Sequence, residues 1–98
     1  MPTFVCLFNW TDQGIKNVRD TTKRSERFKA AIKKAGGSVK DIYWTLGRYD
    51  GLIVFEAPDE ASATAIMLSG GALGSVRTET LRAFDVAEMD KILEKMRA

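Results

Sequence analysis

Histidine is absent from the 98 residues of this chain, and this absence excludes more chemistry than any other feature of the composition. Without histidine there is no Ser-His or Cys-His nucleophile, no histidine general base and no histidine metal ligand. Paired cysteines and carboxylates at ligand spacing are lacking as well. We therefore expect neither a metal site nor a cofactor.

Cysteine occurs once, at Cys6, so no internal disulfide forms and nothing indicates an oxidising compartment. Its neighbours Val5 and Leu7 are apolar, which favours a small core residue over a reactive thiol. No apolar run approaches the roughly 18–20 residues of a membrane span, and the segment 1–4 lacks the basic start of a signal peptide. We expect a cytoplasmic protein with no membrane partner.

Neither positive nor negative charge dominates the sequence, because the formal net charge is only +2. Eight of the fifteen basic residues fall between Lys16 and Lys34, but no aromatic stripe or nucleic-acid-binding signature accompanies them. This pattern favours a solvated helix face, and we expect no nucleic-acid partner. Length and a 45% apolar share predict a single globular domain over residues 1–98.

Four segments alternate or carry the β-branched and aromatic residues typical of strands. They span residues 3–10, 39–46, 52–55 and 75–84, and a turn is expected over 47–51. A helical pattern covers residues 11–35, with Thr11 as its cap and a break at Thr21-Thr22. A second helix is expected over 58–69, ended by Gly70-Gly71, and a terminal helix follows a capping box formed by Asp85 and Glu88.

The order βαββαβ with a tail helix predicts an α+β fold of ferredoxin-like topology. Its four-stranded antiparallel sheet carries both helices on one face. The segments FVCLF and LIVF, predicted as the two central strands, are apolar on both sides. The helices cover one side, so a second sheet is the natural cover for the other. The alternative is that the C-terminal helix folds back over that face.

Several segments carry a family resemblance. The segment Thr45-Leu46-Gly47-Arg48-Tyr49-Asp50, the segment 75–84 (SVRTETLRAF) and the segment 10–16 (WTDQGIK) resemble the GYD-domain family of small bacterial and archaeal proteins. The resemblance implies a dimeric α/β-barrel assembly and says little about activity. The wider superfamily includes cofactor-free oxygenases, isomerases and ligand-binding domains of regulators, and this likeness is at the level of the fold.

Three groups of side chains are candidates for a site. In the predicted turn, Tyr49 and Asp50 either position a ligand or serve the turn itself, since aspartate often accepts backbone hydrogen bonds there. In the last strand, polar residues either bind an anionic or carbonyl compound or form a salt-bridge ladder at a sheet edge. Aromatic residues elsewhere either line a pocket for a flat molecule or pack in the core or at an interface. The strand and aromatic candidates are Arg77, Glu79, Arg82, Trp10, Tyr43 and Trp44.

Three functional hypotheses follow. The first is a homo-oligomeric module, a homodimer or larger, that binds a small organic or anionic ligand at the sheet-to-sheet interface. The second is a cofactor-independent oxygenase or isomerase, with Asp50, Glu79 or Tyr43 transferring the proton. The third is a structural or partner-binding subunit without catalysis.

Overall fold

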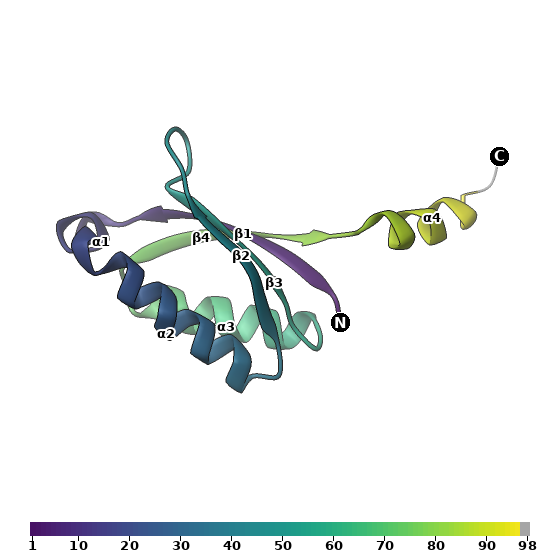
Figure 1. The fold of residues 1–98 in the computed structure, drawn as a ribbon, viewed down its shortest axis with the longest axis horizontal. Coiled ribbons are helices and arrows are strands. Elements are labelled where there is room, and N and C mark those ends of the chain that lie inside the picture. Colours follow the sequence, from purple (N-terminus) through teal and green to yellow (C-terminus); the bar gives the residue numbers. More distant parts are fainter. Residues whose placement is uncertain (97–98) are drawn as a thin grey trace.

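The structure is a computed structural model and describes residues 1–96 (Figure 1). Its elements in chain order are β1 (Thr3–Trp10), α1 (Asp12–Lys16), the 3-10 turn η1 (Val18–Asp20), α2 (Thr21–Lys34), β2 (Ser38–Trp44), β3 (Gly51–Glu56), α3 (Glu60–Ala72), β4 (Val76–Ala83) and α4 (Val86–Glu94). All four strands, the long helices and the tail helix overlap the segments where the sequence predicts them.

The strands form one antiparallel sheet in the order β2-β3-β1-β4. The two segments that are apolar on both sides, β1 and β3, occupy its centre. This arrangement, with α2 and α3 on one face, confirms the ferredoxin-like α+β fold (Figure 1). Direct pairing of Phe4 with Phe55 and of Cys6 with Ile53 places these four side chains on the helix side of the sheet.

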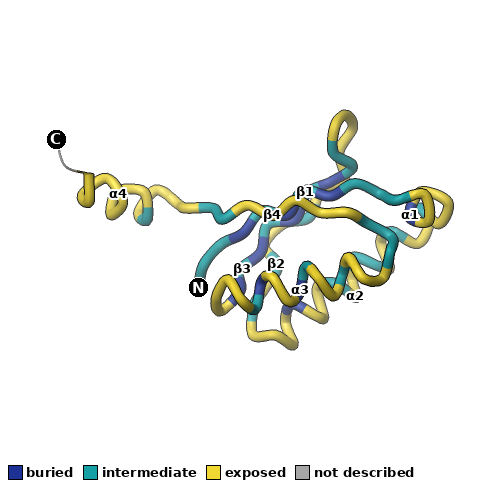
Figure 2. The backbone as a smooth tube through the Cα atoms, turned by 180° about the vertical axis from the view of Figure 1, so that it is seen from behind, coloured by how far each residue is buried: buried dark blue, intermediate teal, exposed yellow. Residues whose placement is uncertain are grey.

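The core lies between that side of the sheet and the two helices (Figure 2). The Phe4 and Phe55 rings stack with centroids 5.5 Å apart, and the Phe28 ring meets Phe55 edge-on at 6.4 Å. The core residues are Phe4, Cys6, Phe8, Ile32, Ile53, Phe55, Ala57, Ala63 and Ile66. Among the described residues no charged or polar side chain is fully buried, so apolar packing holds this core together.

The starts of α1 and α4 follow the sequence signals. The Thr11 hydroxyl accepts a hydrogen bond from the backbone N–H of Gly14, as a cap does. At α4 the Asp85 carboxylate accepts from the Glu88 N–H while the Glu88 carboxylate accepts from the Asp85 N–H. The predicted capping box is therefore confirmed.

Three helix boundaries differ from the sequence expectation, and β2 ends at Trp44, two residues before its expected end. The first break lies at Asn17, before Thr21, because the Asn17 amide binds the Gln13 carbonyl and closes α1. Helix α3 begins after Pro58, because the Asp59 carboxylate caps it by accepting from the Ser62 N–H.

The third difference is at the end of α3, which continues through Gly70 and Gly71 to Ala72. Both glycines keep helical conformation there. The chain leaves the helix at Gly74, whose φ is +86°. A left-handed residue just beyond the C-cap is the usual helix stop, so the terminating glycine is the third of the group.

Helix α4 leads away from the sheet at the end of β4 and does not cover its uncovered face (Figure 1). The alternative in which the tail helix folds back over the sheet is therefore wrong. The radius of gyration is 14.8 Å, against about 12.5 Å for a compact chain of this length. In the part of the chain that the structure describes, no helix has the length and apolarity needed to cross a bilayer.

Candidate functional site

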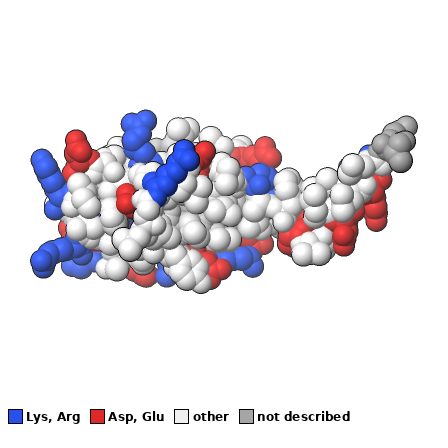
Figure 3. Space-filling model, turned by 90° about the horizontal axis from the view of Figure 1, so that it is seen from above, with Lys and Arg blue, Asp and Glu red and all other residues white. Residues whose placement is uncertain are grey.

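The sheet face opposite the helices, here called the open face, is uncovered in this chain. Residues that alternate with the buried ones in β1 and β3 form its centre: Val5, Leu7, Leu52 and Val54. Tyr43, paired with Leu52, and Leu81, paired with Val5, extend it to both edges and are 58% and 48% exposed. Seen from above, this side of the molecule is largely uncharged (Figure 3). Within residues 1–96, no helix packs on this apolar surface.

A polar cluster borders the open face near the β2–β3 hairpin. The Tyr49 hydroxyl donates a hydrogen bond of 2.7 Å to Glu79, and the Arg48 guanidinium lies 5.7 Å from the Tyr49 ring centroid. With Asn9 and Arg77, paired across β1 and β4, they surround a hollow of about 310 Å³. The hydrogen bond to Glu79 raises the pKa of Tyr49, so this phenol is a donor rather than a base.

Asp50 has a structural role in this geometry. Its carboxylate accepts hydrogen bonds from the backbone N–H of Trp10 at 2.9 Å and from the Asn9 amide at 3.5 Å. In addition, the Asp50 N–H donates to the Phe8 carbonyl at 2.9 Å. Asp50 thus ties the hairpin to the end of β1, beside the polar cluster.

The structure places Arg82 on the helix side of the sheet, opposite Phe4 in the register. Its guanidinium stacks 4.5 Å from the Phe84 ring centroid and forms a 3.1 Å ion pair with Glu88. It also donates to the carbonyls of Thr3 and Ala83. Arg82 therefore anchors the start of α4 and does not share a surface with Arg77.

Trp10 and Trp44 also lie on the helix side. The Trp10 ring packs edge-on against Phe8, and its buried Nε1 has no hydrogen-bond partner among the described residues. The Trp44 Nε1 donates to the Thr21 hydroxyl at 3.1 Å. Of the eight candidates, the structure therefore gathers Tyr49, Glu79 and Arg77 on or beside the open face, with Tyr43 at its far edge and Asp50 behind the hairpin. It separates the other three from them.

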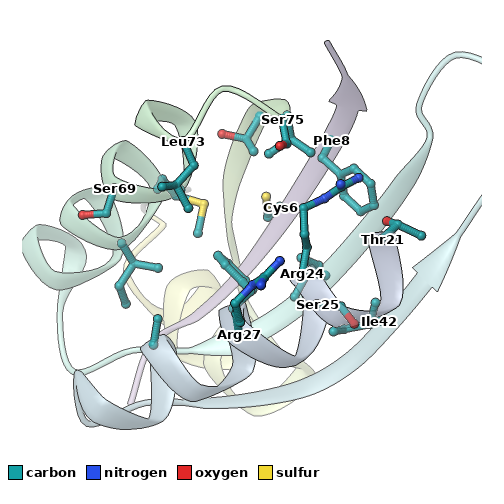
Figure 4. Close-up of a pocket in the computed structure, with 18 of the residues that line it drawn as sticks. Cys6, Phe8, Thr21, Arg24, Ser25, Arg27, Ile42, Ser69, Leu73 and Ser75 are labelled. Atoms are coloured by element: carbon teal, nitrogen blue, oxygen red, sulfur yellow. The ribbon is translucent and has the colours of Figure 1, made fainter. Parts of the chain in front are cut away.

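Sequence reasoning missed a second concave region, the groove between α2, α3 and the sheet (Figure 4). Its volume is about 890 Å³. The signal that points to it in the sequence is a run of small residues on α3 where a tightly packed helix would present larger ones.

Within residues 1–96, no three cysteine or carboxylate side chains gather as ligands for a metal ion. The carboxylates proposed as bases, Asp50 and Glu79, are both engaged in the hydrogen bonds described above. Nothing in the described geometry favours a catalytic reading over a binding one.

By fold, the chain is a ferredoxin-like α+β protein with an uncovered sheet face. It belongs to the GYD domain family, whose model matches residues 4–93. It is 36% identical over 90 residues to a Thermus thermophilus protein named "Glutamine synthetase and cystathionine beta-lyase binding protein", covering 91% of this chain and 95% of the relative.

Two solved structures share the fold at lower identity. FFRP-DM1 superimposes with a TM-score of 0.62 at 17% identity, covering 86% of this chain and all of the other. Ribosomal protein S6 from Thermotoga maritima gives a TM-score of 0.62 at 13% identity, covering 96% and 98% of the two chains. At these identities the likeness concerns the fold alone.

Proposed function

We propose that this protein is a non-catalytic, homo-oligomeric binding module whose open face pairs with a second copy and whose partner is a metabolic enzyme. The observation that carries the proposal is the large solvent-exposed surface area of the single chain. The chain exposes 7018 Å², against about 5,600 Å² for a compact monomer of its mass. The excess is larger than the roughly 800 Å² per partner of a standard interface.

The open face supplies the self-association surface. Its apolar centre is continuous across β1 and β3, and exposed apolar patches of this kind mark interaction sites in soluble proteins. A second copy offers the same flat, apolar sheet, so two copies bury these faces against each other in an isologous contact.

The partner-binding surface is assigned to α4. This helix is amphipathic, projects from the body and is largely exposed (Figure 2). Its exposed apolar residues, with Met96 beyond its end, are Val86, Met89, Ile92, Leu93 and Met96. Amphipathic helices bind by laying such a stripe into a groove of a partner. The name of the Thermus relative makes glutamine synthetase and cystathionine beta-lyase the first enzymes to test.

The self-association is tested with Leu81→Asp on the open face and Leu46→Asp as its control. Leu46 is fully exposed at the hairpin tip, away from the sheet. Light scattering after size-exclusion chromatography should give a dimer or larger assembly for the wild type and for Leu46→Asp, and a monomer for Leu81→Asp. A monomeric wild type at micromolar concentration would refute this part of the proposal.

Enzyme binding is tested by titrating purified glutamine synthetase and cystathionine beta-lyase into the protein in a calorimeter. Leu93→Ser should weaken binding at least tenfold, while Lys95→Ser, two residues along, should leave it within twofold. Equal affinity for both variants would remove α4 as the contact surface. No heat with either enzyme would remove both as partners.

A second candidate function rests on the polar cluster. Arg48, Tyr49, Arg77 and Glu79 surround a hollow at the margin of the open face, where a second sheet would enclose it. The two arginine side chains suit a small carboxylate or carbonyl compound. Thermal-shift screening with small dicarboxylates should stabilise the wild type and the Lys40→Gln control but not Arg77→Gln. Equal shifts in all three proteins would exclude this site.

A further inference from the structure

We propose that the groove between α2, α3 and the sheet binds an amphipathic anion, a molecule with a slender apolar body and a single carboxylate head group. This site is separate from the open face and from α4, and it goes beyond the function proposed above. Figure 4 shows side chains from the sheet and from both helices converging on it.

The groove exists because short side chains face it where α2 and α3 run side by side. It is lined by Ala31 on α2, by Ala35 at the C-cap of α2, and by Ala65, Ser69 and Gly70 on α3. Small residues on both walls leave a groove of about 890 Å³ above the sheet, whose residues Cys6, Phe8 and Ile53 close its bottom. This volume lies within the roughly 300–1,000 Å³ of pockets that enclose small organic ligands.

The floor and walls of the groove are apolar. Cys6, Phe8 and Ile53 form its floor from the sheet, and Phe28 and Met67 add to its walls. Burial raises the pKa of the Cys6 thiol to about 11, so the floor carries no charge at neutral pH. An apolar body gains by leaving water for this surface.

The charge at the groove is of one sign. Arg24 and Arg27 are the charged residues that line it, and no carboxylate does. Arg24 is engaged, since its guanidinium donates to the carbonyls of Asn17 at 3.0 Å and of Gly14. Arg27 has no hydrogen bond or ion pair within residues 1–96, so it is the group available to a carboxylate.

The width of the groove favours a small molecule over a helix. Cα atoms of α2 and α3 approach within 8 Å of one another. A helix with its side chains is about 10–12 Å across and does not enter between them down to β1. An alkyl chain or a flat ring does. The tail helix of a second copy is therefore the less fitting occupant, although it is amphipathic and carries carboxylates.

The test uses decanoate as the probe and decan-1-ol as its uncharged counterpart, each titrated into the full chain by calorimetry. Arg27→Gln should weaken the binding of decanoate at least tenfold and leave the affinity for decan-1-ol within twofold of the wild-type value. Lys23→Gln, one turn earlier on α2 and outside the groove, should change neither. Ala31→Phe should abolish binding of both probes. Ala30→Phe, its exposed neighbour that does not line the groove, should bind both like the wild type.

Methionine methyl NMR locates the probe, because Met67 lines the groove while Met89 and Met96 lie in the tail segment. Decanoate should shift the Met67 signal alone. Shifts of Met89 or Met96 without Met67, or binding that survives Ala31→Phe, would overturn the proposal. Decanoate binding to Leu93→Ser but not to the wild type would also overturn it. That result would mean that α4 of a second copy fills the groove of the wild type. Equal losses of decanoate and decan-1-ol in Arg27→Gln would refute the carboxylate assignment.

Discussion

Gly14 and Gly71 are both helical glycines, but the space around them is opposite. A Cβ on Gly14 would lie 1.9 Å from the Ser75 carbonyl oxygen, because α1 packs against the end of the α3–β4 connection. A Cβ on Gly71 would meet nothing within 4 Å. Gly14→Ala should therefore lower the free energy of unfolding by about 1–3 kcal/mol or more.

Gly71→Ala is the matched control and should raise the free energy of unfolding by about 0.5–1 kcal/mol, because alanine restricts the unfolded chain and favours the helix. Urea denaturation of both variants beside the wild type measures these changes. If both substitutions stabilise, the close approach at Gly14 is wrong.

Cys6 is the residue whose ionisation is most altered by burial, with its pKa raised to about 11. The unfolded thiol releases its proton at lower pH, so stability from the neutral thiol is complete below about pH 8.5 and is lost as pH rises towards 11. The loss at pH 11 should be of the order of 2 kcal/mol. Urea titrations at pH 8 to 11 should show a steeper decline for the wild type than for Cys6→Ala. Parallel curves for the two proteins would contradict the burial effect.

At the scale of the element, the β2–β3 hairpin depends on Asp50. Its carboxylate binds the Trp10 backbone N–H, so Asp50→Ala should lower the free energy of unfolding by about 1.5–3 kcal/mol. Asp50→Asn keeps an acceptor oxygen and should lose less than half of that. Thermal and urea denaturation measure the difference. If both variants are as stable as the wild type, the hairpin is held by other contacts.

The start of α4 depends on the capping box of Asp85 and Glu88. Asp85→Ala should reduce the helicity of residues 86–94, since loss of such a cap costs about 1 kcal/mol locally. The melting temperature should change little, because α4 projects from the body. Backbone chemical shifts of α4 and a calorimetric melt test both statements. A fall of several degrees in the melting temperature would mean that α4 contributes to the stability of the whole assembly.

At the scale of the whole molecule, the uncovered surface predicts that stability depends on protein concentration. Association linked to folding stabilises the native state by mass action. The melting temperature should therefore rise with protein concentration in the wild type and in Leu46→Asp, and stay constant in Leu81→Asp. A melting temperature of the wild type that is independent of concentration would argue that the open face remains uncovered in solution.

Much of the fold follows from local pattern. The segments β1 and β3 are apolar on both sides, and this pattern predicts central strands. The caps at Thr11 and Asp85 can be predicted because they depend on neighbouring residues. The pattern predicts the end of α3 at Gly70-Gly71, but the helix continues to Ala72, because glycine permits a left-handed turn without requiring one. Which glycine of a group takes that conformation depends on packing.

The candidate site was less predictable. Arg77 and Arg82 both lie in β4, but their odd spacing sends them to opposite faces, and only the register shows what each meets. The polar cluster joins the β2–β3 hairpin to β4, and the groove lies between α2 and α3. Both bring together residues distant in the sequence, so no local pattern contains them.

The sequence by itself determined the order of the elements, the family and the apolar character of both sides of the two central strands, because periodicity and local hydrogen bonding decide these. The tertiary structure alone decided that α4 leaves the sheet uncovered and that small residues on two helices leave a groove. Those outcomes depend on where separate elements come to rest in space, which is set by packing across the whole chain.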